Sequence, residues 1–103
     1  SKTEADKFDL REKQLRDLGN QMLLFGKFEA AIKVFELNRS LFPESGYVYD
    51  SLGEAQVMQF NTAKAIEYYK KALEKDSTII NSKKMIMLLE QSPQPMPDST
   101  DGK

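Results

Sequence analysis

Residues 15–35 read LRDLGNQMLLFGKFEAAIKVF, and residues 49–69 read YDSLGEAQVMQFNTAKAIEYY. The two stretches are 34 residues apart, and three features recur at that spacing: Leu18-Gly19 as Leu52-Gly53, Ala31-Ile32 as Ala65-Ile66, and the aromatic ring of Phe35 as that of Tyr69. A repeat of this length indicates that one supersecondary unit occurs twice.

The spacing of the apolar residues predicts helices. From about residue 8 to residue 91 they recur at helical intervals, Gly and Pro are nearly absent, and no strand-like alternation is seen. We therefore expect an all-α chain. A Gly inside a helix is about 1 kcal/mol less favourable than Ala, so Gly19 and Gly53 indicate a close neighbour, and we expect Ala31 and Ala65 there. The residues predicted to pack the repeats are Leu18, Gly19, Ala31, Phe35, Leu52, Gly53, Ala65 and Tyr69.

The turns between the predicted helices are marked by local signals. Gly26 suits the left-handed conformation that ends a helix, whereas Phe60 stands at the equivalent position of the second stretch and predicts a turn that is either strained or differently shaped. We expect one helical domain over residues 1–91. Residues 92–103 are polar and rich in Pro, which predicts a disordered tail.

Composition excludes several classes of function. The chain has 103 residues, of which 40% are hydrophobic and 30% charged, and its net charge of −1 gives no basic excess for nucleic acid. Its longest apolar run, Met85 to Leu89, is far shorter than the roughly 20 residues of a membrane-spanning helix. With no Cys and no His, thiol, imidazole and zinc chemistry are excluded, and we predict no enzyme activity, metal or cofactor. The absence of Cys fits either the cytoplasm or the periplasm.

At the repeated residues the sequence resembles the tetratricopeptide repeat family, whose unit is 34 residues long. The resemblance places one repeat at about 12–45, a second at about 46–79, and a capping helix at about 78–91. It implies an α-α superhelix and a non-catalytic module that binds a peptide or docks a partner domain. The chain departs from the family pattern at Met22, Gln56 and Ser77, among others.

The resemblance also implies a concave groove lined by the first helix of each unit. The positions that face it are Lys13, Arg16, Asn20, Leu23, Tyr47, Asp50, Glu54, Val57, Lys84, and from the last helix also Asn81 and Leu88. In a binding groove, Arg16 and Asn20 would hold carboxylate or backbone groups, whereas Asp50 and Glu54 would favour a basic side chain. The alternative is a solvated polar helix face. Ser51 replaces an Asn of the carboxylate clamp that some family members use, which argues against such a clamp.

A narrower resemblance concerns the sequence of residues 37–55. It is similar to tetratricopeptide segments appended to bacterial hydrolases of the esterase and serine β-lactamase type. It implies an alternative role as a C-terminal accessory or dimerisation domain of a larger enzyme. An association surface is predicted at Met85, Met87 and Leu88, which would dock a second copy or a parent domain. In the other interpretation, these Met side chains fill gaps under the second repeat.

Overall fold

A computed structural model describes residues 10–91, and its regular secondary structure is entirely helical, without a strand in that range. The helices are α2 (Leu10–Leu24), α3 (Phe28–Leu41), α4 (Gly46–Met58), α5 (Thr62–Lys75) and α6 (Ile80–Gln91). The predicted all-α class is confirmed. Among these helices, none combines the length and the hydrophobicity that a bilayer crossing requires.

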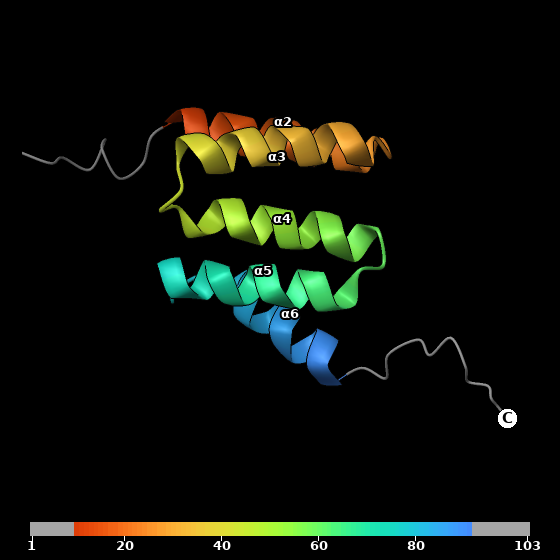
Figure 1. Cartoon of the computed structure of the whole chain (residues 1–103), viewed down its shortest axis with the longest axis vertical. Coiled ribbons are helices and arrows are strands. Elements are labelled where there is room, and N and C mark those ends of the chain that lie inside the picture. The colour runs from red at the N-terminus through yellow and green to blue at the C-terminus, as the bar shows by residue number, and fades with distance from the viewer. Residues whose placement is uncertain (1–9, 92–103) are drawn as a thin grey trace, which may run out of the picture.

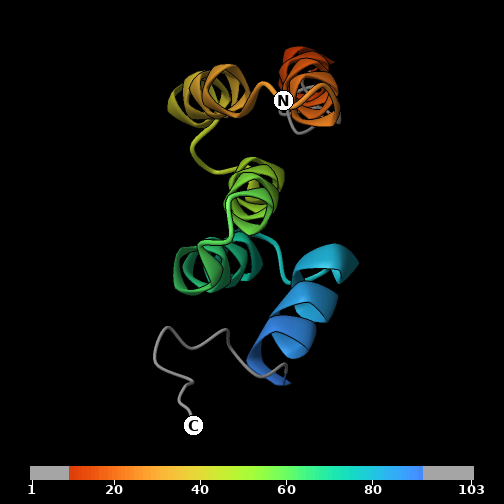
Figure 2. The same ribbon diagram turned by 90° about the vertical axis from the view of Figure 1, so that its right-hand side faces the viewer.

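The helices stack in chain order. Each helix contacts the next one, and α2 also contacts α4. The α2–α3 and α4–α5 turns lie at the same end of the stack (Figure 1). Viewed along the helices, α3 and α5 lie on one side and α2 and α6 on the other, with α4 between them and α6 inclined to the rest (Figure 2). This arrangement leaves α2 and α4 next to each other on one face.

The two turns at that end have the same backbone geometry. Gly26 has a φ of 76° and Phe60 a φ of 64°, so both lie in the left-handed region. The same pair of hydrogen bonds closes each turn: Gly26 N–H to Leu23 O (3.0 Å) with Lys27 N–H to Met22 O (2.8 Å), and Phe60 N–H to Val57 O (2.9 Å) with Asn61 N–H to Gln56 O (2.9 Å). This is the pattern that commonly terminates a helix. Of the two alternatives at Phe60, the structure has a turn of the same shape with a non-glycine residue in the left-handed region.

Both mid-helix glycines lie against a neighbouring helix, but the contact differs from the expected one. A Cβ at Gly19 would overlap the ring of Phe35, and a Cβ at Gly53 would lie 2.8 Å from Cε1 of Tyr69. Ala31 and Ala65 are fully buried, yet neither is the residue that fills the space at the glycine. The aromatic ring one helical turn later reaches across instead, because it is long enough to cover the glycine surface.

The predicted packing residues are buried with one exception. Leu52 is fully buried and belongs to a cluster with Ala31 and Phe35 of α3, whereas Leu18 is 42% exposed. The difference follows from the stacking order. Helix α3 covers the face of α4 that carries Leu52, while no helix within residues 10–91 covers the corresponding face of α2. The prediction that Leu18 packs like its counterpart is therefore wrong for this part of the chain.

The last helix begins at Ile80 rather than near residue 78. The Asp76 carboxylate accepts hydrogen bonds from the backbone N–H (2.9 Å) and the hydroxyl of Thr78, which holds the preceding residues in a turn. These bonds also keep the pKa of Asp76 below its usual value. The predicted tail at 92–103 and the beginning of the predicted domain, residues 1–9, lie outside the described residues.

Candidate binding groove

A hollow of about 340 Å³ lies between α2 and α4, and we call it the α2–α4 groove. Its walls consist of Arg16, Asn20, Leu23, Leu24, Asp50, Ser51, Glu54 and Met58. Five of the residues predicted to face a groove are among them: Arg16, Asn20, Leu23, Asp50 and Glu54. The groove therefore combines one basic, two acidic and several apolar side chains on two neighbouring helices.

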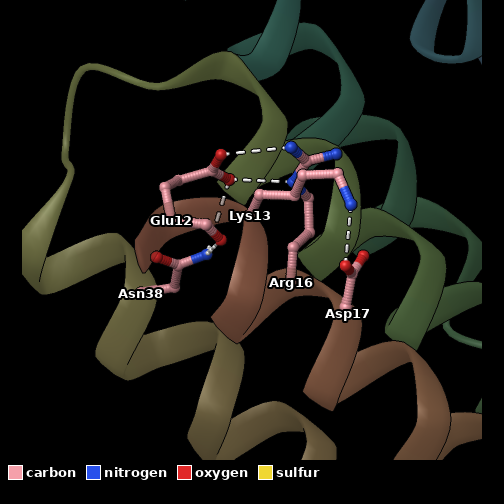
Figure 3. Close-up of polar contacts among 5 residues, drawn as sticks. All are labelled: Glu12, Lys13, Arg16, Asp17 and Asn38. Atoms are coloured by element: carbon pink, nitrogen blue, oxygen red, sulfur yellow. Dashed lines mark hydrogen bonds and ion pairs between the residues drawn. The ribbon is translucent and has the colours of Figure 1, made fainter. Parts of the chain in front are cut away.

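Arg16 is already engaged within the chain. Its Nε and Nη2 donate to the two carboxylate oxygens of Glu12 at 2.9 and 3.1 Å, and its guanidinium lies 4.6 Å from the centre of the Tyr47 ring (Figure 3 shows the ion pair). A buried amide supports Glu12 from α3, because Asn38 Nδ2 donates to the Glu12 backbone oxygen at 3.0 Å. A bidentate ion pair of this kind fixes the orientation of the guanidinium and neutralises its charge.

Lys13 lies on the same helix but does not line the groove. Its Nζ lies 2.8 Å from Oδ2 of Asp17, one turn further on, and both side chains are well exposed (Figure 3). The hydrogen bond from Lys13 lowers the pKa of the Asp17 carboxyl. Exposed pairs of this type contribute little to stability, so we interpret Lys13 and Asp17 as surface residues beside the groove.

The two acidic residues of the groove also join helices. Asp50 accepts hydrogen bonds from Asn81 Nδ2 (3.0 Å) and Ser82 Oγ (2.6 Å), which tie α4 to α6. Glu54 Oε1 accepts a hydrogen bond from the Tyr69 hydroxyl (3.0 Å between the oxygens), which links α4 to α5. Burial, and then the adjacent Glu54 carboxylate, raise the pKa of Tyr69. All three donors are neutral, so these contacts do not pair Asp50 or Glu54 with a cation.

The other predicted groove residues lie outside the walls of this groove. Tyr47 is 38% exposed and supports the Arg16 guanidinium, and Val57 is half-buried. Lys84 is exposed, and within residues 10–91 no carboxylate pairs with it. Asn81 and Leu88 lie on α6, where Asn81 is bound to Asp50 and Leu88 is 50% exposed.

Three wall residues were not predicted from the sequence to face a groove: Leu24, Ser51 and Met58. Leu24 follows Asn20, and Met58 follows Glu54, by one helical turn, so the i, i+4 spacing along each helix could have identified them. Leu24 is 80% exposed and Met58 is 37% exposed. One end of the groove is therefore apolar and open to solvent.

Charge in the groove is unequal. The walls carry two carboxylates, Asp50 and Glu54, and one cation, Arg16. Arg16 pairs with Glu12, which lies outside the walls, so the charges of Asp50 and Glu54 have no paired cation among the described wall residues. The described part of the chain contains no cluster of three or more acidic side chains that could hold a metal ion.

The predicted association surface on α6 is partly exposed. Met87 is 57% exposed and Leu88 is 50% exposed, whereas Met85 is half-buried. Ile80, one to two turns earlier on the helix, is 75% exposed.

Comparison of the sequence with models of known protein families finds no match, and comparison with curated proteins also finds none.

Proposed function

We propose that this chain is a non-catalytic protein–protein interaction module whose α2–α4 groove binds a peptide segment or the surface of a partner domain. The observation that carries the proposal is the groove itself, in which solvent-exposed apolar side chains lie beside charged ones on two neighbouring helices. Binding sites for peptides typically combine apolar contact with a few polar groups that fix orientation.

We also propose that the scaffold is a pair of tetratricopeptide repeats followed by a capping helix. The support is the 34-residue recurrence of three features: the left-handed residues Gly26 and Phe60, the turn hydrogen bonds around them, and the glycine-to-ring contacts of the two helix pairs. In such a scaffold the first helices of successive units line a shared face, in agreement with the contact between α2 and α4.

The test uses a random nonapeptide display library against the purified chain. We expect selected peptides to shift the ¹H–¹⁵N resonances of Asn20, Ser51 and Glu54. Leu24→Ser should weaken binding about fivefold because it removes apolar contact from a side chain that is 80% exposed and contributes little to folding. The matched control is Leu41→Ser, at a 55% exposed position of α3 that does not line the groove.

Two outcomes would contradict this proposal. One is a library that yields no peptide with saturable binding. The other is a set of selected peptides whose resonance shifts lie away from α2 and α4, with equal effects of Leu24→Ser and Leu41→Ser on affinity.

A second candidate function is that of an accessory or dimerisation domain of a larger bacterial hydrolase. The observation in its favour is the exposed apolar side chains of α6, namely Ile80, Met87 and Leu88. Self-association through them should give a mass that rises with concentration in sedimentation velocity and falls with Met87→Lys. A concentration-independent monomer would exclude this form of the second candidate.

A further inference from the structure

We propose that the α2–α4 groove selects a cationic segment, in which a Lys or Arg side chain lies against Glu54, beside Asp50, while an apolar side chain two residues away packs on Met58 and Leu24. The inference rests on the proposed function, because it specifies the chemistry of the partner for the same groove.

The charge of the groove favours a cation. Asp50 and Glu54 are one helical turn apart on α4, and within residues 10–91 both accept side-chain hydrogen bonds from neutral groups only. Their charges are therefore not compensated by those contacts. A carboxylate accepts more than one hydrogen bond, so Glu54, which is half-buried, retains capacity for an incoming ammonium or guanidinium group.

The basic residue of the groove is poorly placed to recruit an anion. Arg16 uses Nε and Nη2 on Glu12, and the pair is partly shielded, with side-chain exposures of 25% for Arg16 and 11% for Glu12. A carboxylate ligand would have to compete with Glu12 and then approach Asp50 and Glu54. Like charges brought together in this way disfavour the wrong partner. Asn20, the other predicted anion contact, is neutral.

The spacing of the walls sets the pattern of the ligand. Asp50, Glu54 and Met58 follow one another at intervals of four residues, which corresponds to about 6 Å along a helix. Alternate side chains of an extended peptide are about 6.6–6.8 Å apart and point to the same side. A basic residue opposite Glu54 therefore lies two positions from an apolar residue opposite Met58. Asp50, one turn before Glu54, adds a second negative charge beside the basic residue.

Leu24 completes the apolar end from the opposite helix. Its side chain is 80% exposed. An apolar ligand side chain between Leu24 and Met58 would remove both from water, a gain that is roughly proportional to the apolar area covered. The groove thus offers an acidic subsite and an apolar subsite in a fixed order along α4.

The experiment titrates ¹⁵N-labelled chain with the peptide Gly-Ser-Lys-Ser-Leu-Ser-Gly, blocked at both ends, and with versions that carry Gln or Glu in place of Lys. We expect the Lys peptide to bind about fivefold more tightly than the Gln peptide, and the Glu peptide to bind more weakly still. The preference for Lys should shrink between 50 and 500 mM NaCl, because salt screens exposed charges.

The decisive variant is Glu54→Gln. It removes the charge but keeps a side-chain oxygen that can accept the Tyr69 hydroxyl, so folding should be preserved. We expect it to reduce the preference for Lys over Gln by about threefold. The control is Glu67→Gln on α5, which removes the same charge from an exposed residue outside the groove and should leave the preference unchanged.

The outcomes separate this inference from the proposed function. Equal binding of the three peptides, tighter binding of the Glu peptide, no binding of any of them, or an equal effect of Glu54→Gln and Glu67→Gln would each overturn the charge preference. The proposed function would still stand if library-selected peptides shift α2 and α4. If those selected peptides also fail to bind the groove, both the inference and the proposed function are wrong.

Discussion

The two helix pairs of this chain, α2–α3 and α4–α5, solve the same packing problem with different chemistry. Near the start of α2, Glu12 meets Asn38 of α3, and the buried amide donates to the Glu12 backbone oxygen at 3.0 Å. The residues 34 positions later are Gly46 and Ala72, where a Cβ on Gly46 would lie 2.7 Å from the Ala72 oxygen. The first pair is joined by a polar bridge and the second by direct contact of small residues.

The difference affects the groove. In the first pair, the bridge from Asn38 holds α2 at Glu12, and Glu12 in turn holds Arg16. In the second pair, the position equivalent to Arg16 is Asp50, which has no such partner on its own helix and binds α6 instead. At equivalent positions, α2 therefore carries a cation that is paired with Glu12, and α4 carries an anion that is hydrogen-bonded to neutral groups of α6. This difference is the origin of the groove's negative charge.

The largest effect is expected from breaking the polar bridge with Asn38→Asp. Asn38 is fully buried, and its Oδ1 accepts no hydrogen bond from residues 10–91, so a carboxylate there would have no donor in this part of the chain and would lie close to Glu12. We expect a loss of about 3–4 kcal/mol in the free energy of unfolding at pH 7, measured by urea denaturation. Asn61→Asp, at an exposed helix start, is the control and should stay within about 0.5 kcal/mol of the parent.

The pH dependence of this variant gives a second check. Burial raises the pKa of the introduced carboxyl in the folded state above its unfolded value of about 3.9. Folding then takes up a proton. The loss in the free energy of unfolding is therefore complete well above the folded-state pKa, and it diminishes as the pH falls from that pKa toward the unfolded-state pKa. We expect about 2 kcal/mol to be recovered between pH 7 and pH 5 relative to the parent. An equal loss at both pH values would contradict a buried, unpaired charge.

A smaller effect is expected where a ring covers a glycine in each pair. Ala normally stabilises a helix interior by about 1 kcal/mol over Gly, but a methyl at Gly19 overlaps the Phe35 ring, and one at Gly53 crowds Tyr69 less severely. We expect Gly19→Ala to cost about 2 kcal/mol and Gly53→Ala about 1 kcal/mol, measured by thermal and urea unfolding. In a Phe35→Leu background the cost of Gly19→Ala should fall by about half, and a cost that is unchanged there would exclude the ring as its cause.

The sequence predicted the helices, their turns and the crowded glycines, because these depend on local periodicity and on residues that few conformations tolerate. It did not predict which residue covers each glycine. Ala31 and Phe35 lie one turn apart on the same face of α3, so spacing alone cannot distinguish them. The choice depends on how far α3 slides along α2, which is a property of the packed pair.

The groove was predicted in part for a similar reason. Its position followed from the resemblance, and Arg16, Asn20 and Asp50 line it as expected. The pairing of Arg16 with Glu12 has the i, i+4 spacing that a helix brings together, so the sequence contained that signal. The contact of Asp50 with Ser82 joins residues 32 positions apart, and no local pattern reveals it.

The smallest effect is expected from exchanging the turn residues that the two pairs do not share. Nothing lies within 4 Å of a Cβ built on Gly26, so Gly26→Ala tests the left-handed backbone alone. That conformation costs a non-glycine residue about 1–2 kcal/mol, offset by about 0.4–1 kcal/mol because Ala restricts the unfolded chain. We therefore expect Gly26→Ala to lower the free energy of unfolding by about 0.5–1 kcal/mol.

Phe60→Gly is the reverse exchange and should have the opposite sign. The Phe60 side chain is 87% exposed, so its removal loses little burial, and relief of the strained φ should raise the free energy of unfolding by about 0.5 kcal/mol. The double variant should return close to the parent, because the two turns lie in different helix pairs. Destabilisation by Phe60→Gly would instead show that the exposed ring makes stabilising contacts.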